Sequence, residues 1–156
     1  MSISIKVKDF LDENEVEYTT ITHSKAYTAQ RIASSSMIPG SEMAKTVVVK
    51  VDGNYALAVL PAPEKLDLKQ FAENIGVGKI ELASETEFRN LFEDCETGAM
   101  SPFGNLYNLK TYISTDFTKH RMITFNAGNH VELIRMRYST FEKLVNPIII
   151  DIDLHK

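Results

Sequence analysis

The chain has 156 residues, 44% of them hydrophobic, and this length suits one domain, residues 1–156, that buries roughly 70% of its extended surface. Its apolar runs are shorter than the roughly 20 residues of a membrane span, and one cysteine excludes an internal disulfide or a zinc site of several thiolates. From these features we expect a soluble cytoplasmic protein with no membrane partner. The net charge of −4 argues against wholesale coating of nucleic acid, so no DNA partner is expected.

The first third of the chain predicts two helices, a strand and a hairpin. Apolar residues close to helical spacing predict a helix over residues 2–14, and β-branched and aromatic residues predict a strand over 16–22. Thr28 is the predicted N-cap of a second helix. Two apolar runs, 44–51 and 55–60, flank an Asp-Gly turn and predict a β-hairpin.

A lysine stands out in the first strand of this hairpin. Period-2 alternation places Lys45 on one face with Val47, Val49 and Val51, and this valine-rich face is expected to meet the core. An ammonium group at the edge of an apolar interior is costly unless it meets an anion or water. Two interpretations stay open: a functional lysine in a pocket, or a lysine that reaches past the strand end to solvent.

The rest of the chain mixes short helices and strands. Residues 65–75 predict an amphipathic helix, 80–83 a short strand, and 140–144 a last helix. Ser84 and Glu87 form a capping box that begins a further helix, which reaches about Phe92. Strands are also expected in four places, residues 111–114, 121–126, 131–138 and 148–150. This order predicts an α+β fold: a single domain with a mixed, curved, barrel-like β-sheet surrounded by helices.

Two glycine-containing segments suit the display of backbone groups. In residues 98–104, two glycines bracket a proline, so the loop is stiff and its N–H groups can approach a ligand closely. We expect this loop at a pocket rim, with few core contacts. Residues 126–130, Asn-Ala-Gly-Asn-His, form a second polar cluster between two strands. The alternative interpretation of residues 98–104 is an ordinary tight connection, and that of residues 126–130 is a hairpin turn.

Residues with familiar hydrolytic chemistry are sparse. The histidines show no i, i+4 pairing and no carboxylate at metal-ligand spacing, and a G-x-S-x-G nucleophile motif is absent. Cys95 lies among Glu93, Asp94 and Glu96, whose charges are expected to raise its pKa and weaken its thiolate. A metal centre or a protein nucleophile is therefore not expected.

Taken together, the lysine, the glycine–proline loop and the Asn/Gly/His turn resemble the YbaK/ProX family of aminoacyl-tRNA deacylases, which is related to the editing domain of bacterial prolyl-tRNA synthetases. The matching segments are Ala44-Lys45-Thr46, Leu66-Asp67-Leu68, a Gly-x-x-x-Pro-x-Gly signature (Gly98, Pro102, Gly104), Gly128-x-His130, and His23 with Ala26-Tyr27-Thr28-Ala29. Ala99 replaces a second glycine common in the family, and Asn126 begins a turn that differs from the Ser-Gly-Gly type. Both departures touch the pocket, so substrate identity does not transfer.

The resemblance implies a fold of the YbaK/aminoacyl-tRNA synthetase-associated domain type and hydrolysis of the ester that joins a wrong amino acid to tRNA, without a metal or organic cofactor. It implies catalytic roles for Lys45, Gly98 and His130, with the loop backbone around the ester and the lysine near the terminal phosphate or ribose. The substrate's ribose hydroxyl would help to activate water. Substrate-binding roles are implied for His23, Tyr27, Thr28, Ala99, Met100, Ser101, Pro102, Gly104, Asn126, Gly128 and Asn129.

The acceptor end of a mischarged tRNA is thus the expected partner, and an aminoacyl-tRNA synthetase is a further candidate. Two other functional classes stay open. One is a binding module that holds an aminoacyl adenosine or nucleotide without turnover, and the other is a partner that docks on a synthetase. Turnover of mischarged tRNA separates the enzyme from both.

Overall fold

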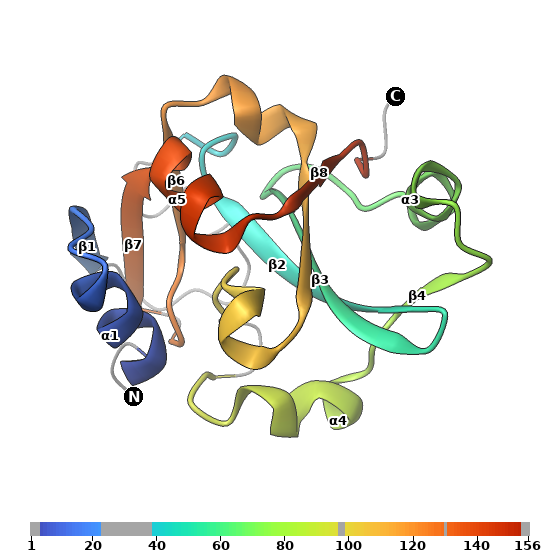
Figure 1. The fold of residues 1–156 in the computed structure, drawn as a ribbon, viewed down its shortest axis with the longest axis horizontal. Helices are drawn as coiled ribbons and strands as arrows, with labels where there is room; N and C mark the ends of the chain where they lie inside the picture. Colours follow the sequence, from blue (N-terminus) through green and yellow to red (C-terminus); the bar gives the residue numbers. More distant parts are fainter. Residues whose placement is uncertain (1–3, 23–38, 97–98, 130, 154–156) are drawn as a thin grey trace.

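The structure, a computed structural model, describes residues 4–22, 39–96, 99–129 and 131–153. Its strands form two open sheets (Figure 1). The antiparallel sheet of three strands has the order β1 (Tyr18–Thr22), β7 (Glu132–Arg137), β6 (Met122–Asn126). The mixed sheet of five strands has the order β4 (Ile80–Leu82), β2 (Ala44–Val51), β3 (Asn54–Pro61), β5 (Lys110–Ser114), β8 (Ile148–Ile150). The α+β fold with a mixed sheet is confirmed, but the described strands are divided between two open sheets and do not close into the expected barrel-like sheet.

The predicted hairpin is the centre of the larger sheet. Strands β2 and β3 pair antiparallel from Ala44 opposite Pro61 to Val51 opposite Asn54. The turn between them has positive φ at Asp52 (48°) and Gly53 (87°), as a tight hairpin turn requires. Both faces of β2 are buried, because Val48 is 2% exposed and Val49 is fully buried. The expectation that only the face of Val49 meets the core is therefore incomplete.

Four α-helices surround the sheets in the described part of the chain: α1 (Ile5–Glu13), α3 (Leu68–Ile75), α4 (Glu85–Phe88) and α5 (Tyr138–Val145). Ser4 caps α1, Asp67 caps α3, and Ser84 with Glu87 forms the predicted capping box of α4. The helix predicted after Thr28 lies outside the described residues. None of the described helices is long and apolar enough to cross a bilayer.

The predicted boundary between the strand over 131–138 and the last helix is wrong, and two short helices were not predicted. Tyr138 begins α5 and does not end the preceding strand, because its ring is buried and packs 6.2 Å from the ring of Phe141 one turn later. Tertiary packing here overrides the β-propensity of an aromatic residue. The helix predicted to reach about Phe92 continues after α4 as the 3₁₀ helix η1 (Arg89–Phe92). The 3₁₀ helices η2 (Gly104–Tyr107) and η3 (Thr115–Lys119) were not predicted, because they are too short to leave a periodic pattern.

The two faces of the larger sheet belong to different apolar clusters. Phe103 lies in a cluster that also contains α1 and α5 residues, whereas Leu60 and Phe71 lie in a cluster under α3. Figure 1 shows α3 and α1 at opposite ends of the molecule. Residues that alternate along β2 and β3 therefore face different surroundings.

A partly buried ion pair joins the two sheets where Met43 forms a bridge with Thr124. Glu42 accepts hydrogen bonds from Thr124 Oγ1 at 2.7 Å and from Arg135 Nε at 2.9 Å. Burial alone would raise the pKa of Glu42, but the hydrogen bonds from Arg135 and Thr124 outweigh it and lower that pKa. The carboxylate is therefore charged and fixes β6 and β7 against the start of β2.

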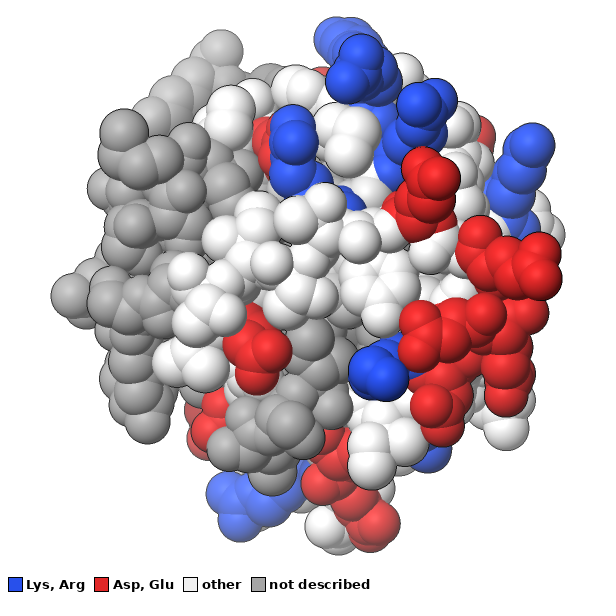
Figure 2. All heavy atoms as spheres, turned by 90° about the vertical axis from the view of Figure 1, so that its left-hand side faces the viewer, with Lys and Arg blue, Asp and Glu red and all other residues white. Residues whose placement is uncertain are grey.

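Surface charge is unevenly distributed (Figure 2). On the face shown, Asp and Glu side chains gather on one side and Lys and Arg side chains lie mainly along the upper edge. The exposed acidic residues of α1 and the segment after it are Asp9, Asp12, Glu13, Glu15 and Glu17. The exposed basic residues beside β6 and β7 are Lys119, Arg121 and Arg137.

Candidate active site

The glycine–proline loop and the Asn/Gly/His turn lie side by side. The Gly128 N–H donates to the Ala99 carbonyl at 2.9 Å, and the Glu96 N–H donates to the Gly128 carbonyl at 2.7 Å. Gly128 has φ +110°, a conformation that favours glycine. An ideal Cβ at this position would lie 2.9 Å from the Ser4 nitrogen, so the turn also needs the missing side chain. Two segments separated in sequence are thus joined through their backbones.

Residues 99–104 are more buried than the sequence suggested. Ala99, Ser101 and Phe103 are fully buried, and the ring of Phe103 lies 5.3 Å from that of Phe125. Pro102 and Gly104 are also buried. The expectation of a rim loop with few core contacts is wrong for this part, because Phe103 anchors it in the aromatic core.

Two hydroxyl groups beneath the loop have no hydrogen-bond partner among the described residues: Ser101 Oγ and Thr111 Oγ1. A Cβ on Gly104 would lie 2.2 Å from Thr111 Oγ1 and 2.7 Å from the Leu109 carbonyl oxygen. Gly104 therefore serves close packing of the loop on β5. Ser101 is buried without a base among its described hydrogen-bond partners, which does not suit a nucleophile.

The two asparagines of the turn hold its shape. Asn126 Nδ2 donates to the Asn129 carbonyl at 3.1 Å, and Asn129 Oδ1 accepts from the Val131 and Glu132 N–H groups at 2.9 and 2.7 Å. Both asparagine side chains are buried. Their hydrogen bonds are directed into the turn, so they position the backbone on either side of residue 130.

A polar network that the sequence did not reveal fixes both segments to α1. Ser4 N–H donates to the Ala127 carbonyl at 2.7 Å, and the Ser4 hydroxyl donates to Asp94. Tyr107 donates to the other oxygen of Asp94 at 2.8 Å. Burial alone would raise the pKa of Asp94, but the hydrogen bonds from Ser4 and Tyr107 lower it. These contacts connect distant parts of the chain, so no local pattern signals them.

The only cysteine of the chain is a poor nucleophile. Burial raises the pKa of the Cys95 thiol to about 11, and the Asp94 charge adds a smaller rise. Cys95 Sγ lies 3.5 Å from the Tyr107 hydroxyl. The raised pKa agrees with the sequence, although burial is its main cause and the neighbouring charges are secondary.

We expect deacylation to survive both Cys95→Ala and incubation with EDTA, because the thiol is protonated at neutral pH and serves packing. Removing the sulfur from a partly buried site costs roughly 1 kcal/mol of stability. Initial rates and melting curves of the variant measure both effects. Loss of activity with the fold intact would indicate covalent catalysis, and loss on EDTA treatment that zinc restores would indicate a metal.

Lys45 occupies the end of an apolar face, as its strand position predicts. It lies opposite Leu60, which belongs with Val49 and Phe71 to the cluster under α3. Burial lowers the pKa of the Lys45 ammonium, while the negative charges of Asp153 and Glu64 partly oppose that effect. Lys45 is thus a partly desolvated cation at a strand end.

The structure does not bring Lys45 onto the same face of the sheet as the loop. Met100 packs with Val48 and Leu57, on the opposite face of β2. A substrate that contacts both has to reach around the beginning of β2. Five predicted site residues lie outside the described residues: His23, Tyr27, Thr28, Gly98 and His130.

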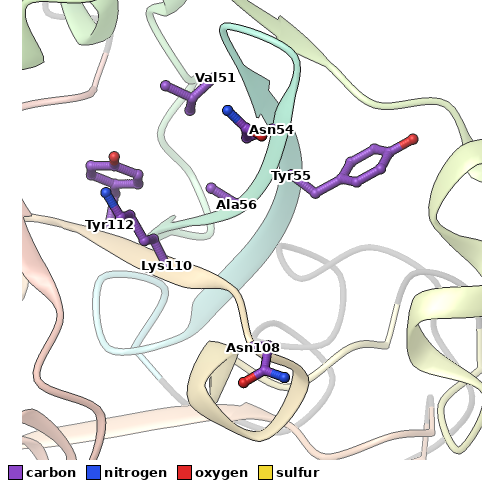
Figure 3. Close-up of a pocket in the computed structure, with 7 residues that line it drawn as sticks. All are labelled: Val51, Asn54, Tyr55, Ala56, Asn108, Lys110 and Tyr112. Atoms are coloured by element: carbon purple, nitrogen blue, oxygen red, sulfur yellow. The ribbon is translucent and has the colours of Figure 1, made fainter.

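A cavity of about 280 Å³ lies near the hairpin turn (Figure 3). It is lined by Val51, Asn54, Tyr55, Ala56, Asn108, Lys110 and Tyr112. Figure 3 shows Tyr55 directed away from the side chains of Ala56 and Tyr112. Val51 is six residues from Lys45 along β2, roughly 20 Å. The cavity contains none of the predicted site residues, so we assign it no part in catalysis.

Histidine, cysteine and carboxylate side chains are common metal ligands in proteins. Within residues 4–22, 39–96, 99–129 and 131–153, no three such side chains gather in a way that could hold an ion.

The sequence matches the family model of the aminoacyl-tRNA editing domain over residues 23–144. It is 26% identical over 148 residues to the multifunctional Ser/Thr-tRNA deacylase ProXp-y of Escherichia coli (strain K12), covering 90% of this chain and 87% of the relative. It is 25% identical over 141 residues to the prolyl-tRNA editing protein ProX of Acetoanaerobium sticklandii, covering 86% and 85%. A solved structure described as a candidate trans-editing enzyme for prolyl-tRNA synthetase has a TM-score of 0.82 at 18% identity, covering 97% of each chain. These matches confirm the resemblance that the motifs indicate.

Proposed function

The chain belongs to the aminoacyl-tRNA editing domain family, and we propose on this premise that it is a trans-editing hydrolase. It cleaves the ester bond between a wrong amino acid and the terminal adenosine of tRNA. The curated relatives support this proposal, because one is named a Ser/Thr-tRNA deacylase and the other a prolyl-tRNA editing protein. A non-catalytic binding module is the less favoured alternative.

The observation that carries the proposal is the backbone pairing of loop and turn. Hydrogen bonds from Gly128 to Ala99 and from Glu96 to Gly128 hold the described parts of the loop and the turn against each other. Such fixed geometry suits an ester that is already activated, because positioning and one oxyanion donor suffice. A single backbone donor of this kind is worth roughly 3 kcal/mol.

Roles for individual residues follow from chemistry and family resemblance. The backbone near Gly98 donates to the developing oxyanion, and His130 orients the ester or the water. Lys45 binds the terminal phosphate or ribose, for which a partly desolvated ammonium is suited. The substrate's ribose hydroxyl assists the water, and no metal or cofactor takes part. Ala99, Met100, Ser101, Pro102 and Gly104 shape the loop, Asn126, Gly128 and Asn129 shape the turn, and His23, Tyr27 and Thr28 complete the pocket.

Surface charge supports one direction of approach for the tRNA. The acidic segment around α1 repels phosphates, whereas Lys119, Arg121 and Arg137 attract them. We place the acceptor stem over these basic residues. The whole chain, residues 1–156, acts as one cytoplasmic editing domain in this proposal, and a synthetase is its further partner.

A deacylation screen tests the proposed function. The panel contains tRNAs mischarged with serine and threonine, and tRNA for proline carrying several wrong amino acids, because the relatives bear those names. We expect release of at least one amino acid at a rate well above spontaneous ester hydrolysis, with the correctly charged tRNA spared. Stable binding of mischarged tRNA without release would favour the binding module, and stoichiometric capture of a synthetase without turnover would favour a docking partner.

Three loop and turn variants separate backbone positioning from a serine nucleophile. Gly98→Ala should reduce single-turnover deacylation strongly, because a Cβ there intrudes on the ester. His130→Ala should have an intermediate effect. Ser101→Ala should be mild and as stable as wild type, because it removes a buried hydroxyl without a described partner. A burst of acyl-enzyme together with Ser101→Ala as the most damaging change would overturn this mechanism.

A further inference from the structure

A buried carboxylate lies near Lys45 at the C-terminal end of the described chain. Asp153 is 1% exposed and forms a bridge with Leu66, just before α3. Its Oδ2 accepts a hydrogen bond from the Ser114 hydroxyl at 2.8 Å. Its Oδ1 is buried and has no hydrogen-bond partner among the described residues. A carboxylate held this way is expensive to bury, so its place needs an explanation.

The strand register places this carboxylate on the face that carries Lys45. Lys45 lies opposite Leu60 on β3, and the next strand β5 pairs Ile113 with Val59. Ser114 follows Ile113, so it occupies the same row as Leu60 and Lys45 and its side chain points to the same face. Adjacent strands lie about 4.8 Å apart, which puts Ser114 two strands, roughly 10 Å, from Lys45. A lysine side chain that extends toward Ser114 covers most of this distance.

The charged groups that face this pair come from several elements. Lys45 interacts with the negative charges of Asp153 and Glu64 and with the positive charge of Lys65. Burial is the largest cause that raises the pKa of Asp153 to about 7, Asp116 and Glu64 contribute to the same rise, and the Ser114 hydrogen bond opposes it. Asp153 therefore changes its charge near neutral pH, within reach of the proposed catalytic cation.

We propose that Asp153 is a positioning residue that directs the Lys45 ammonium and maintains its positive charge. The inference rests on the proposed function, because Lys45 has its catalytic role only there. Ser114 sets the orientation of the carboxylate, and the negative charge of Asp153 interacts with the Lys45 ammonium. The ionised carboxylate favours the charged ammonium, which in turn binds the terminal phosphate or ribose of the substrate.

A direct test follows the Lys45 amine by NMR in protein with isotope-labelled lysine side chains, without substrate. In Asp153→Asn the amine should titrate at a lower pH than in wild type, because the nearby anion is gone. Asp52→Asn is the matched control, since Asp52 also lies in the β2–β3 hairpin but at its far end, where it accepts from the Lys79 N–H at 2.9 Å. Equal Lys45 titrations in all three proteins would overturn the proposal, whatever the deacylase assay shows.

The second test is the pH dependence of single-turnover deacylation. The alkaline limb of the profile should move to lower pH in Asp153→Asn. At a pH above the Lys45 pKa of both proteins, each pH unit of this shift lowers the charged fraction of Lys45 about tenfold. Ser114→Ala removes the donor to Asp153, so its acid limb should move to higher pH. Unchanged limbs in both variants would contradict the proposal, whereas absence of turnover in wild type would refute the proposed function alone.

Thermal melts exclude a merely structural role. Because the pKa of Asp153 is raised to about 7 in the native protein, the stability that this group contributes is fully present below its ordinary pKa and is lost as the pH rises through about 7. Asp153→Asn avoids that loss, so at pH 8 it should melt no lower than wild type while its deacylation is impaired. A lower melting temperature together with an unmoved lysine titration would make Asp153 structural only.

Discussion

Lys45→Ala is expected to reduce deacylation by roughly 100-fold or more, which is the scale for removing one preorganised electrostatic contact. The ammonium lies at the end of an apolar face, and burial lowers its pKa. Its removal abolishes a desolvated charge, so the melting temperature should change little. Asp153, whose pKa is raised to about 7, can take up a proton when the lysine is absent.

Single-turnover assays on mischarged tRNA measure this effect, with Lys50→Ala as the matched control. Lys50 lies on the same strand but on the other face, and its Nζ pairs with Glu87 at 2.7 Å. The control should keep its activity and melt close to wild type, because an ion pair near the surface contributes little to stability. Wild-type activity in Lys45→Ala would show that the lysine has no catalytic role, and unfolding of the variant would contradict the expectation that the fold stays intact.

Gly128→Ala is expected to lower the free energy of unfolding by about 3 kcal/mol, which corresponds to a melting temperature lower by roughly 6–12 °C. The added Cβ meets the Ser4 nitrogen at 2.9 Å and the Ser4 Cβ at 3.0 Å. The backbone φ of +110° adds strain for any residue with a side chain. Activity should fall as well, because the turn leads directly to His130.

Gly53→Ala separates the two causes. Gly53 also has a positive φ, +87°, but a Cβ there would meet nothing within 4 Å. It should therefore show backbone strain alone, about 1–2 kcal/mol, and retain deacylation. If Gly53→Ala and Gly128→Ala melt at the same temperature, the contact with Ser4 does not constrain the turn.

Strong local patterns predicted their elements well. The Asp-Gly turn between apolar runs produced the hairpin, because its residues tolerate the positive φ angles of 48° and 87° that are found there. The spacing of Ser84 and Glu87 produced the capping box, because both hydrogen bonds are local. At Tyr138, side-chain packing determines where the strand ends and the helix begins, and local patterns placed this boundary wrongly.

The sequence identified the separate segments of the site but did not predict how they are arranged in space. Motif spacing identified the loop and the turn, and the hydrogen bond from Gly128 to Ala99 brings them together. Motif spacing did not indicate that Phe103 anchors residues 99–104 in the core, nor that Met100 and Lys45 lie on opposite faces of β2. Burial of a loop depends on side chains supplied by distant strands, which turn residues do not reveal.

By itself the sequence determined the local elements and the family, because capping, turn chemistry, strand alternation and motif residues act over a few positions. Only the tertiary structure decided which residues surround the site. The contact of Gly128 with Ser4, the hydrogen bond of Tyr107 to Asp94 and the place of Asp153 beside the row of Lys45 all join distant parts of the chain. Such contacts follow from how two sheets and their helices pack, and packing is a property of the whole chain that no short segment contains.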